Sequence, residues 1–321
     1  MRTRFRTVSA GSLAVLLGLT VAVSACGKYS WSALSAKKNI KEAHELYKGS
    51  KWKEAAAAYE AAVAADPSLE GAHFFLANSY DNLYKPSRAG ESENDAYMQK
   101  AIEWYKKAAE KEPSGIYRQR SMQYLVAAYG PEKLNQPAEA EPIVKKMIEM
   151  DSSDYLNYVE LSKIYENAGR YDEAEAQLLK AREVKPKQPE VYVALSNYYN
   201  RQGEFDKTIE ALRMAADLQP ENPQGYQLVA TFFEEKVRKD PRLTPDQQKK
   251  YAQDGIASTD KALSLNKDYV DALVYKNILL RRMANLEKDR SKQEALLKQA
   301  DELRNRAMEL GKKKSTGQPG Q

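Results

Sequence analysis

The sequence has few of the residues on which most catalytic and metal sites depend. It contains one cysteine, Cys26, and two histidines, His44 and His73, among 321 residues. Neither histidine has a second histidine or a cysteine at the spacing of metal ligands. No nucleophile elbow, phosphate-binding loop, zinc-protease motif or glycine-rich dinucleotide motif occurs. A single cysteine also excludes an internal disulfide framework. We therefore expect no enzyme activity, no metal and no cofactor.

The chain also lacks a strong charge of one sign. Its formal net charge is +5, to which Arg2, Arg4 and Arg6 contribute three and the Lys312–Lys314 run another three. The body between these segments is close to neutral and mixes both signs, which argues against a nucleic-acid partner. Residues 311–321 are polar as well as basic, and we predict a disordered tail there.

No apolar run reaches the roughly 20 residues needed to cross a bilayer. The longest begins at Leu13 and ends at Val23, after a basic segment and before Ser24-Ala25-Cys26, which is typical of a secretory signal peptide. The cleavage site resembles the lipobox of bacterial lipoproteins. That resemblance implies that residues 1–25 are removed, that Cys26 carries lipid, and that residues 26–36 form a short tether. The alternative is that Cys26 is an ordinary buried thiol.

What the chain does have is a period of 34 residues. The same register recurs in six sets of positions: Tyr158, Tyr192 and Tyr226; Leu161, Leu195 and Val229; Tyr165, Tyr199 and Phe233; Gly169 and Gly203; Ala181 and Ala215; and Pro186 and Pro220. A period of this length is typical of stacked helical hairpins.

One repeat shows how the hairpin is encoded. Its first helix has an inward stripe at i, i+3, i+4 and i+7, from Tyr158 to Tyr165. Gly169 ends that helix, because glycine adopts the left-handed conformation without a Cβ penalty. The small side chains of Ala174 and Ala181 in the second helix then allow close packing of the pair.

This pattern resembles the tetratricopeptide-repeat (TPR) family over nearly all of the chain beyond its N-terminal segment. The resemblance implies an all-α fold, a right-handed superhelical α-α solenoid of about seven TPR-like helical hairpins, over residues 37–310. The last pair, from Tyr269 to Leu310, is predicted to be a terminal cap. His73 stands where Tyr158 stands in its own repeat, so we expect it to pack inside, whereas we expect His44 at a surface or groove position.

Two repeats are longer than the others. Twelve residues are inserted after Tyr80 and thirteen after Phe233. The helix after the second insertion is predicted to begin at Thr244, an N-cap followed by proline and, three residues later, by a glutamine. Both insertions combine proline with positive charge: Tyr84, Lys85, Pro86 and Arg88 in the first, and Arg238, Lys239, Pro241 and Arg242 in the second. They contact an acidic partner or lipid head groups, or they are surface insertions without a ligand.

In the TPR family, ligands lie along the face built by the first helix of each hairpin. Matching positions by register gives ten candidate residues for a partner-binding groove: Tyr47, Asn78, Asn82, Arg120, Gln123, Lys163, Asn167, Asn197, Asn200 and Arg201. Amide and guanidinium side chains can hold a peptide backbone or a carboxylate. The alternative is that they are only the exposed polar positions of helices.

Together these resemblances imply a membrane-anchored TPR scaffold of the bacterial cell envelope that binds a protein or peptide partner during assembly or secretion of envelope components. The membrane is contacted through the lipid on Cys26. In the lipoprotein family, Gly27 in the next position favours the outer membrane, facing the periplasm. The alternative function is a carrier or sensor that holds a small ligand or a glycan in the concave groove.

Overall fold

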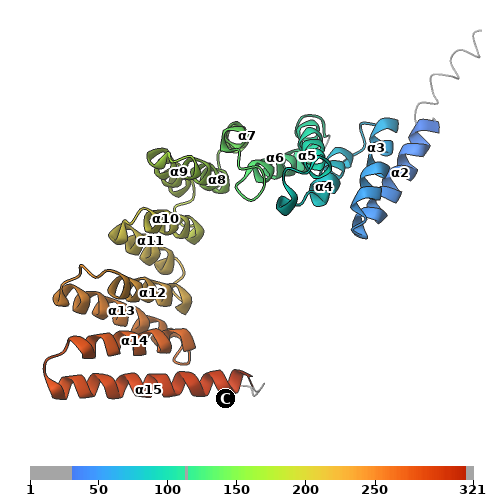
Figure 1. Cartoon of the computed structure of the whole chain (residues 1–321). Coiled ribbons are helices and arrows are strands. Elements are labelled where there is room, and N and C mark those ends of the chain that lie inside the picture. The colour runs from blue at the N-terminus through green and yellow to red at the C-terminus, as the bar shows by residue number, and fades with distance from the viewer. Residues whose placement is uncertain (1–30, 113–114, 316–321) are drawn as a thin grey trace, which may run out of the picture. The chain divides into compact units, whose positions relative to one another are not determined.

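The computed structural model describes residues 31–112 and 115–315 (Figure 1). Cys26 and the predicted signal peptide lie outside these residues. In the described part the chain forms fourteen α-helices, one short 3-10 helix and no strand. The elements are α2 (Trp31–Lys48), α3 (Trp52–Ala65), α4 (Ala72–Leu83), η2 (Pro86–Arg88), α5 (Ser92–Lys111), α6 (Gly115–Tyr129), α7 (Pro137–Met150), α8 (Tyr155–Asn167), α9 (Tyr171–Val184), α10 (Pro189–Arg201), α11 (Phe205–Asp217), α12 (Pro223–Lys239), α13 (Pro245–Leu265), α14 (Val270–Leu286) and α15 (Arg290–Ser315).

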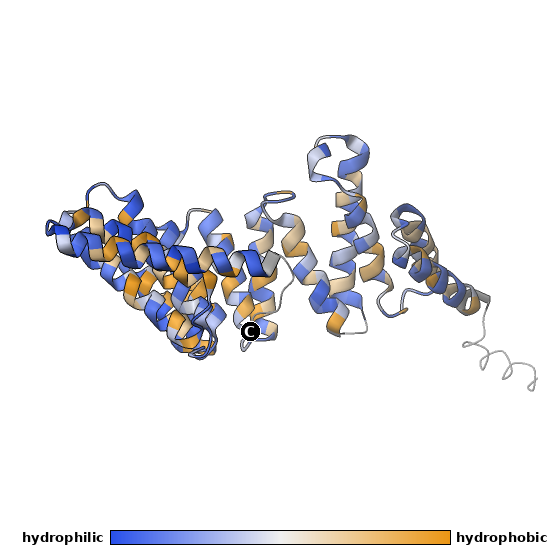
Figure 2. Cartoon of the chain, turned by 90° about the horizontal axis from the view of Figure 1, so that it is seen from below, coloured by the Kyte–Doolittle hydropathy of each residue, from blue (hydrophilic) through white to orange (hydrophobic). Residues whose placement is uncertain are grey.

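Consecutive helices pack in pairs from α2 with α3 to α14 with α15, which gives seven hairpins in the described residues. The predicted all-α solenoid of about seven helical hairpins is confirmed. The chain divides into two compact units, residues 1–150 with α2 to α7 and residues 151–321 with α8 to α15. In both units, individual helices carry apolar as well as polar residues, as the periodic apolar positions in the sequence predict (Figure 2).

The predicted helix end at Gly169 and the predicted helix start at Thr244 are confirmed. Gly169 and Gly203 end the first helices of their hairpins with φ of +74° and +76°, the left-handed conformation that glycine adopts most readily. The side chain of Thr244 accepts a hydrogen bond from the backbone N–H of Gln247, and the Gln247 side chain accepts one from the N–H of Thr244. This reciprocal capping fixes the start of α13.

The described helices extend beyond the predicted limits of the solenoid. Helix α2 already begins at Trp31, inside the segment assigned to a tether, and α15 continues to Ser315, inside the segment assigned to a disordered tail. Both ends thus contribute additional helical turns to the terminal hairpins.

The two insertions are largely helical. Most of the additional residues lengthen helices: α5 has 20 residues and α13 has 21, against 14 in α9 and 13 in α11. Only residues 84–91 and 240–244 connect the longer helices. Ala252 of α13 is fully buried and packs in a core cluster with Ala230 and Leu279.

His73 is buried inside the first unit, in agreement with its repeat position. His44, expected at a surface or groove position, is half-buried and packs against aromatic side chains of the first unit. Its Nδ1 lies 2.5 Å from the hydroxyl of Tyr59, and its ring packs edge-on against Tyr59 and Phe75. Burial lowers the pKa of His44, and the nearby positive charge of Lys48 lowers it further.

Candidate functional site

All ten candidate groove residues lie on the first helices of their hairpins. In the first unit they belong to α2, α4 and α6: Tyr47, Asn78, Asn82, Arg120 and Gln123. In the second unit they belong to α8 and α10: Lys163, Asn167, Asn197, Asn200 and Arg201. The structure brings some of them together in pockets and leaves others separate.

Three of the candidates meet in one pocket of about 430 Å³ in the first unit, which we call the α4 pocket. It is lined by Tyr47, Trp52, Asn78, Asp81, Asn82, Tyr124 and Lys133. The lining residues come from three successive first helices, from the start of α3 and from the turn between α6 and α7. Hydroxyl, amide, carboxylate and ammonium groups therefore border one hollow.

A hydrogen-bond network holds the floor of the α4 pocket. The Tyr47 hydroxyl donates to Oδ1 of Asn78 over 2.6 Å, and Nδ2 of Asn82 donates to the same oxygen over 2.9 Å. Nδ2 of Asn78 donates to the hydroxyl of Tyr105 over 2.9 Å. Asn78 is thus buried and bonded within the fold, whereas Asn82 is half-buried and Tyr124 is exposed.

Asp81, Lys133 and Tyr124 belong to this pocket although they are absent from the sequence-based candidates. Asp81 is buried, accepts a hydrogen bond from the Tyr105 hydroxyl over 3.2 Å, and pairs with Nζ of Lys133 over 2.5 Å. Burial raises the pKa of Tyr105, and the charge of Asp81 raises it further. Lys133 lies in the turn of the third hairpin, and its position does not belong to the 34-residue pattern.

Arg120 and Gln123 are exposed on α6 and are not among the residues that line the α4 pocket. In the second unit, Lys163 pairs with Glu160 on its own helix over 3.2 Å. Arg201 on α10 donates two hydrogen bonds to Glu166 on α8, over 2.6 and 2.7 Å. This bidentate pair links two neighbouring hairpins, so Arg201 has a structural role in the repeat stack.

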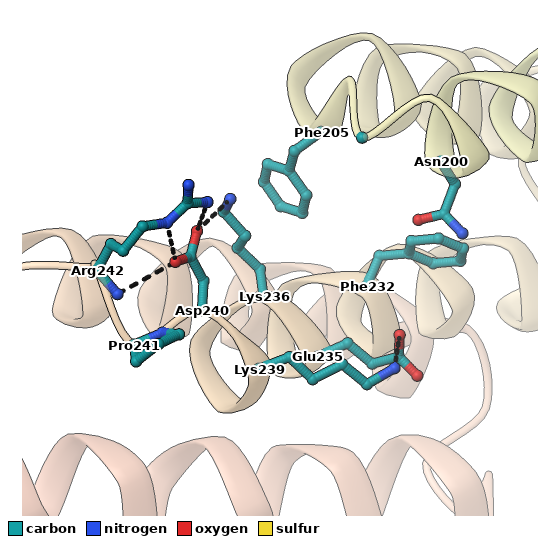
Figure 3. A pocket seen from close by; sticks show the side chains of 10 residues that line it. Asn200, Phe205, Phe232, Glu235, Lys236, Lys239, Asp240, Pro241 and Arg242 are labelled. Carbon is teal, nitrogen blue, oxygen red and sulfur yellow. Dashed lines mark hydrogen bonds and ion pairs between the residues drawn. The ribbon is translucent and has the colours of Figure 1, made fainter.

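Asn200 lines a second pocket, of about 480 Å³, which we call the α12 pocket (Figure 3). Its lining residues are Asn200, Gly203, Phe205, Phe232, Glu235, Lys236, Lys239, Asp240, Pro241 and Arg242. The pocket therefore joins a candidate groove residue to Lys239, Pro241 and Arg242 of the second insertion. Asn167 and Asn197 are exposed on the first helices and do not line it.

A third pocket, of about 320 Å³, also contains Phe205 and lies against α11 and α13. Its aromatic wall is formed by Phe205, Phe233 and Tyr251, whose ring centroids are 5.3 to 6.1 Å apart. These rings pack against the apolar core between α11, α12 and α13. We assign this pocket to the packing of the core.

The described ranges contain no group of three or more histidine, cysteine, aspartate and glutamate side chains arranged to hold a metal ion. Over the same ranges, none of the helices combines the length and the apolar character that crossing a bilayer requires.

Models of the tetratricopeptide repeat match residues 40–97 and 133–198. These two segments are recognised as tetratricopeptide repeats. The matched ranges include the α4 pocket's Tyr47 and Asn78, all of α8 and the part of α10 up to residue 198. No curated protein sequence matches the chain.

Solved TPR structures resemble this one at low sequence identity. The C-terminal part of a TPR repeat-containing protein from Cytophaga hutchinsonii is 16% identical with a TM-score of 0.54, over 84% of this chain and 98% of that one. A TPR protein from Parabacteroides merdae is 13% identical with a TM-score of 0.46, over 83% and 99%. YrrB, described as a TPR protein with an unusual peptide-binding site, is 21% identical with a TM-score of 0.41, over 63% and 92%. At these identities the similarity concerns the fold alone.

Proposed function

We propose that the protein is an interaction scaffold of the bacterial cell envelope that binds a protein or peptide partner through its TPRs and is tethered to a membrane by lipid on Cys26. The single observation that supports binding most directly is the α4 pocket. Side chains from three successive hairpins line this pocket, and they do not form an arrangement typical of a catalytic site.

The composition of the α4 pocket favours a peptide over a small apolar ligand. Small-molecule pockets are mainly apolar, with few polar groups. Here the lining carries two asparagines, an aspartate paired with a lysine, and the hydroxyls of Tyr47 and Tyr124. Asn82 and Lys133 retain hydrogen-bonding capacity beyond their internal contacts, which suits the alternating donors and acceptors of a peptide backbone.

Tyr124→Ala is expected to weaken partner binding about tenfold, because tyrosines at the centre of an interface contribute a large share of binding energy. Its side chain is 38% exposed at the pocket, so a partner can reach it. Tyr171→Ala is the matched control, since Tyr171 is 49% exposed on α9 and lines neither pocket. A photo-crosslinking residue at position 124 should capture a partner in cells, and one at position 171 should not. Equal capture at both positions would exclude the α4 pocket as the binding surface.

The membrane tether has its own test. Cys26→Ser should abolish incorporation of labelled fatty acid and release the processed chain from the membrane fraction, because serine cannot form the thioether that carries the lipid. Ser32→Ala, a substitution a short distance along the chain, should change neither property. Gly27 leads us to expect the parent protein in the outer-membrane fraction. Unchanged labelling and fractionation of Cys26→Ser would disprove the anchor while leaving the proposed partner binding intact.

A further inference from the structure

The α12 pocket owes its form to the additional length of one helix. Helix α12 has 17 residues where α10 in the preceding hairpin has 13. Lys236 and Lys239 lie in its last turns, and the loop that follows supplies Asp240, Pro241 and Arg242. The facing wall is the end of α10 and the turn that leads to Phe205 at the start of α11. The pocket thus lies at the loop ends of two hairpins, and Asn200 is the one residue of its lining that register predicted for the groove.

Two aromatic rings line the pocket from opposite sides. Phe205 reaches in from α11 and Phe232 from α12, and the Asn200 amide lies beside the ring of Phe232 (Figure 3). Both rings are only partly buried, although each packs against the core cluster that contains Val229 and Phe233. The pocket therefore has a fixed apolar interior that remains open to a side chain from outside.

Charged groups are arranged around this apolar interior. Asp240 accepts hydrogen bonds from Nζ of Lys236 over 2.9 Å and from Nε and Nη2 of Arg242 over 2.9 and 3.1 Å. Lys239 pairs with Glu235 over 3.0 Å. The Lys236 ammonium also lies 5.1 Å from the centroid of the Phe205 ring. Hydrogen bonds from Arg242 and then Lys236 lower the pKa of Asp240, so this aspartate stays ionised and holds the two cations together.

The pocket's lining carries an excess of positive charge, because Lys236, Lys239 and Arg242 face two carboxylates. Each lysine uses only part of its hydrogen-bonding capacity in the pairs described, and a guanidinium has five N–H donors. A carboxylate can therefore be accepted at the rim while an apolar group enters between the rings. Arg238, the remaining basic residue of the insertion, pairs instead with Glu234 and Glu235 and does not line the pocket.

We propose that the α12 pocket binds an acidic peptide segment in which an aromatic or large aliphatic side chain lies next to one or two carboxylates. The side chain occupies the space between Phe205 and Phe232, and the carboxylates contact Arg242 and the two lysines. Lipid head groups fit less well, since the two acidic side chains leave a net charge of only +1 and membranes attract basic segments by the sum of their charges. This site adds to the proposed interaction role and does not depend on the α4 pocket or on Cys26.

The experiment measures binding of fluorescein-labelled octapeptides to the purified full-length protein. The first peptide carries Asp-Phe-Glu at its centre, the second Asn-Phe-Gln and the third Asp-Ala-Glu. We expect the first to bind, and we expect both altered peptides to bind at least about tenfold more weakly, because each removes one of the two interactions. Binding of the first peptide should also weaken as the salt concentration rises. Equal binding of all three peptides would overturn the proposal.

Two variants locate the binding. Phe232→Ala removes one ring, and Arg242→Ala removes the rim cation; each should weaken binding of the Asp-Phe-Glu peptide about fivefold or more. Arg290→Ala is the matched control, since Arg290 is 88% exposed and Arg242 is 86% exposed, and each pairs with one carboxylate. Arg242→Ala leaves the core untouched, so it tests the site even if Phe232→Ala unfolds more easily. Unchanged affinity in Arg242→Ala, or binding to phosphatidylglycerol vesicles in place of peptide, would overturn the assignment.

Discussion

Glu112→Ala is expected to lower the free energy of unfolding of the first unit by about 2 to 6 kcal/mol, because two buried backbone donors lose their partner at a cost of about 1 to 3 kcal/mol each. Glu112 ends α5 and is fully buried. It accepts hydrogen bonds from the backbone N–H groups of Gly71 over 2.7 Å and His73 over 2.9 Å, at the start of α4. Alanine leaves both donors buried without a partner. Urea unfolding at neutral pH measures the loss, and Glu110→Ala, an exposed position of the same helix, is the matched control.

The same side chain gives the first unit a defined dependence on pH. Burial raises the pKa of Glu112, but the His73 side chain, whose Nδ1 lies 3.4 Å from Oε1, and the hydrogen bonds from the two backbone groups outweigh it, so that the pKa falls below its ordinary value of 4.5. A carboxyl group whose pKa is lowered by folding stabilises the folded state above pH 4.5, and this contribution is lost as the pH falls further. The difference between the parent and Glu112→Gln should therefore shrink below that pH. A difference that stays constant down to pH 3 would show that the charge of Glu112 contributes nothing.

Ala181→Glu is expected to destabilise the second unit by several kcal/mol, because it inserts an unpaired charge between packed helices. Ala181 on α9 has no exposed surface, as its position in the repeat predicts. Neighbouring hairpins share their core, so the damage should spread through the stack and lower the cooperativity of unfolding. Ala176→Glu is the matched control, since Ala176 is exposed on the same helix. Thermal unfolding followed by circular dichroism should separate the two variants, and coincident curves would contradict the proposed register.

The helical hairpins could be predicted because their signals are local. Gly169 requires no neighbour to end a helix at positive φ, and Thr244, with proline and Gln247 after it, caps α13 through bonds within four residues. The burial of Ala181 followed from periodicity, since a helix must turn one stripe toward its partner. The fold class and the approximate number of hairpins depended only on such signals repeated along the chain.

The binding surfaces depended on contacts that no periodicity encodes. His44 was expected at a surface or groove position, and the structure places its imidazole, with an apolar body and a polar tip, between Phe75 and the hydroxyl of Tyr59. Asn78 was expected to face a partner, but the tyrosine hydroxyls around it satisfy its amide inside the first unit.

The sequence by itself therefore determined the class of fold, the positions of the hairpins and the helix faces that turn inward, because each follows from spacing, capping and propensity within one repeat. Only the tertiary structure decided which polar side chains converge in a pocket. Asp81 and Lys133 form an ion pair although 52 residues separate them in the sequence. The α12 pocket forms because the additional turns of α12 extend past the turn that precedes Phe205. The ion pair and the pocket both result from packing between hairpins, because the distance between two such side chains depends on the backbones of two different elements.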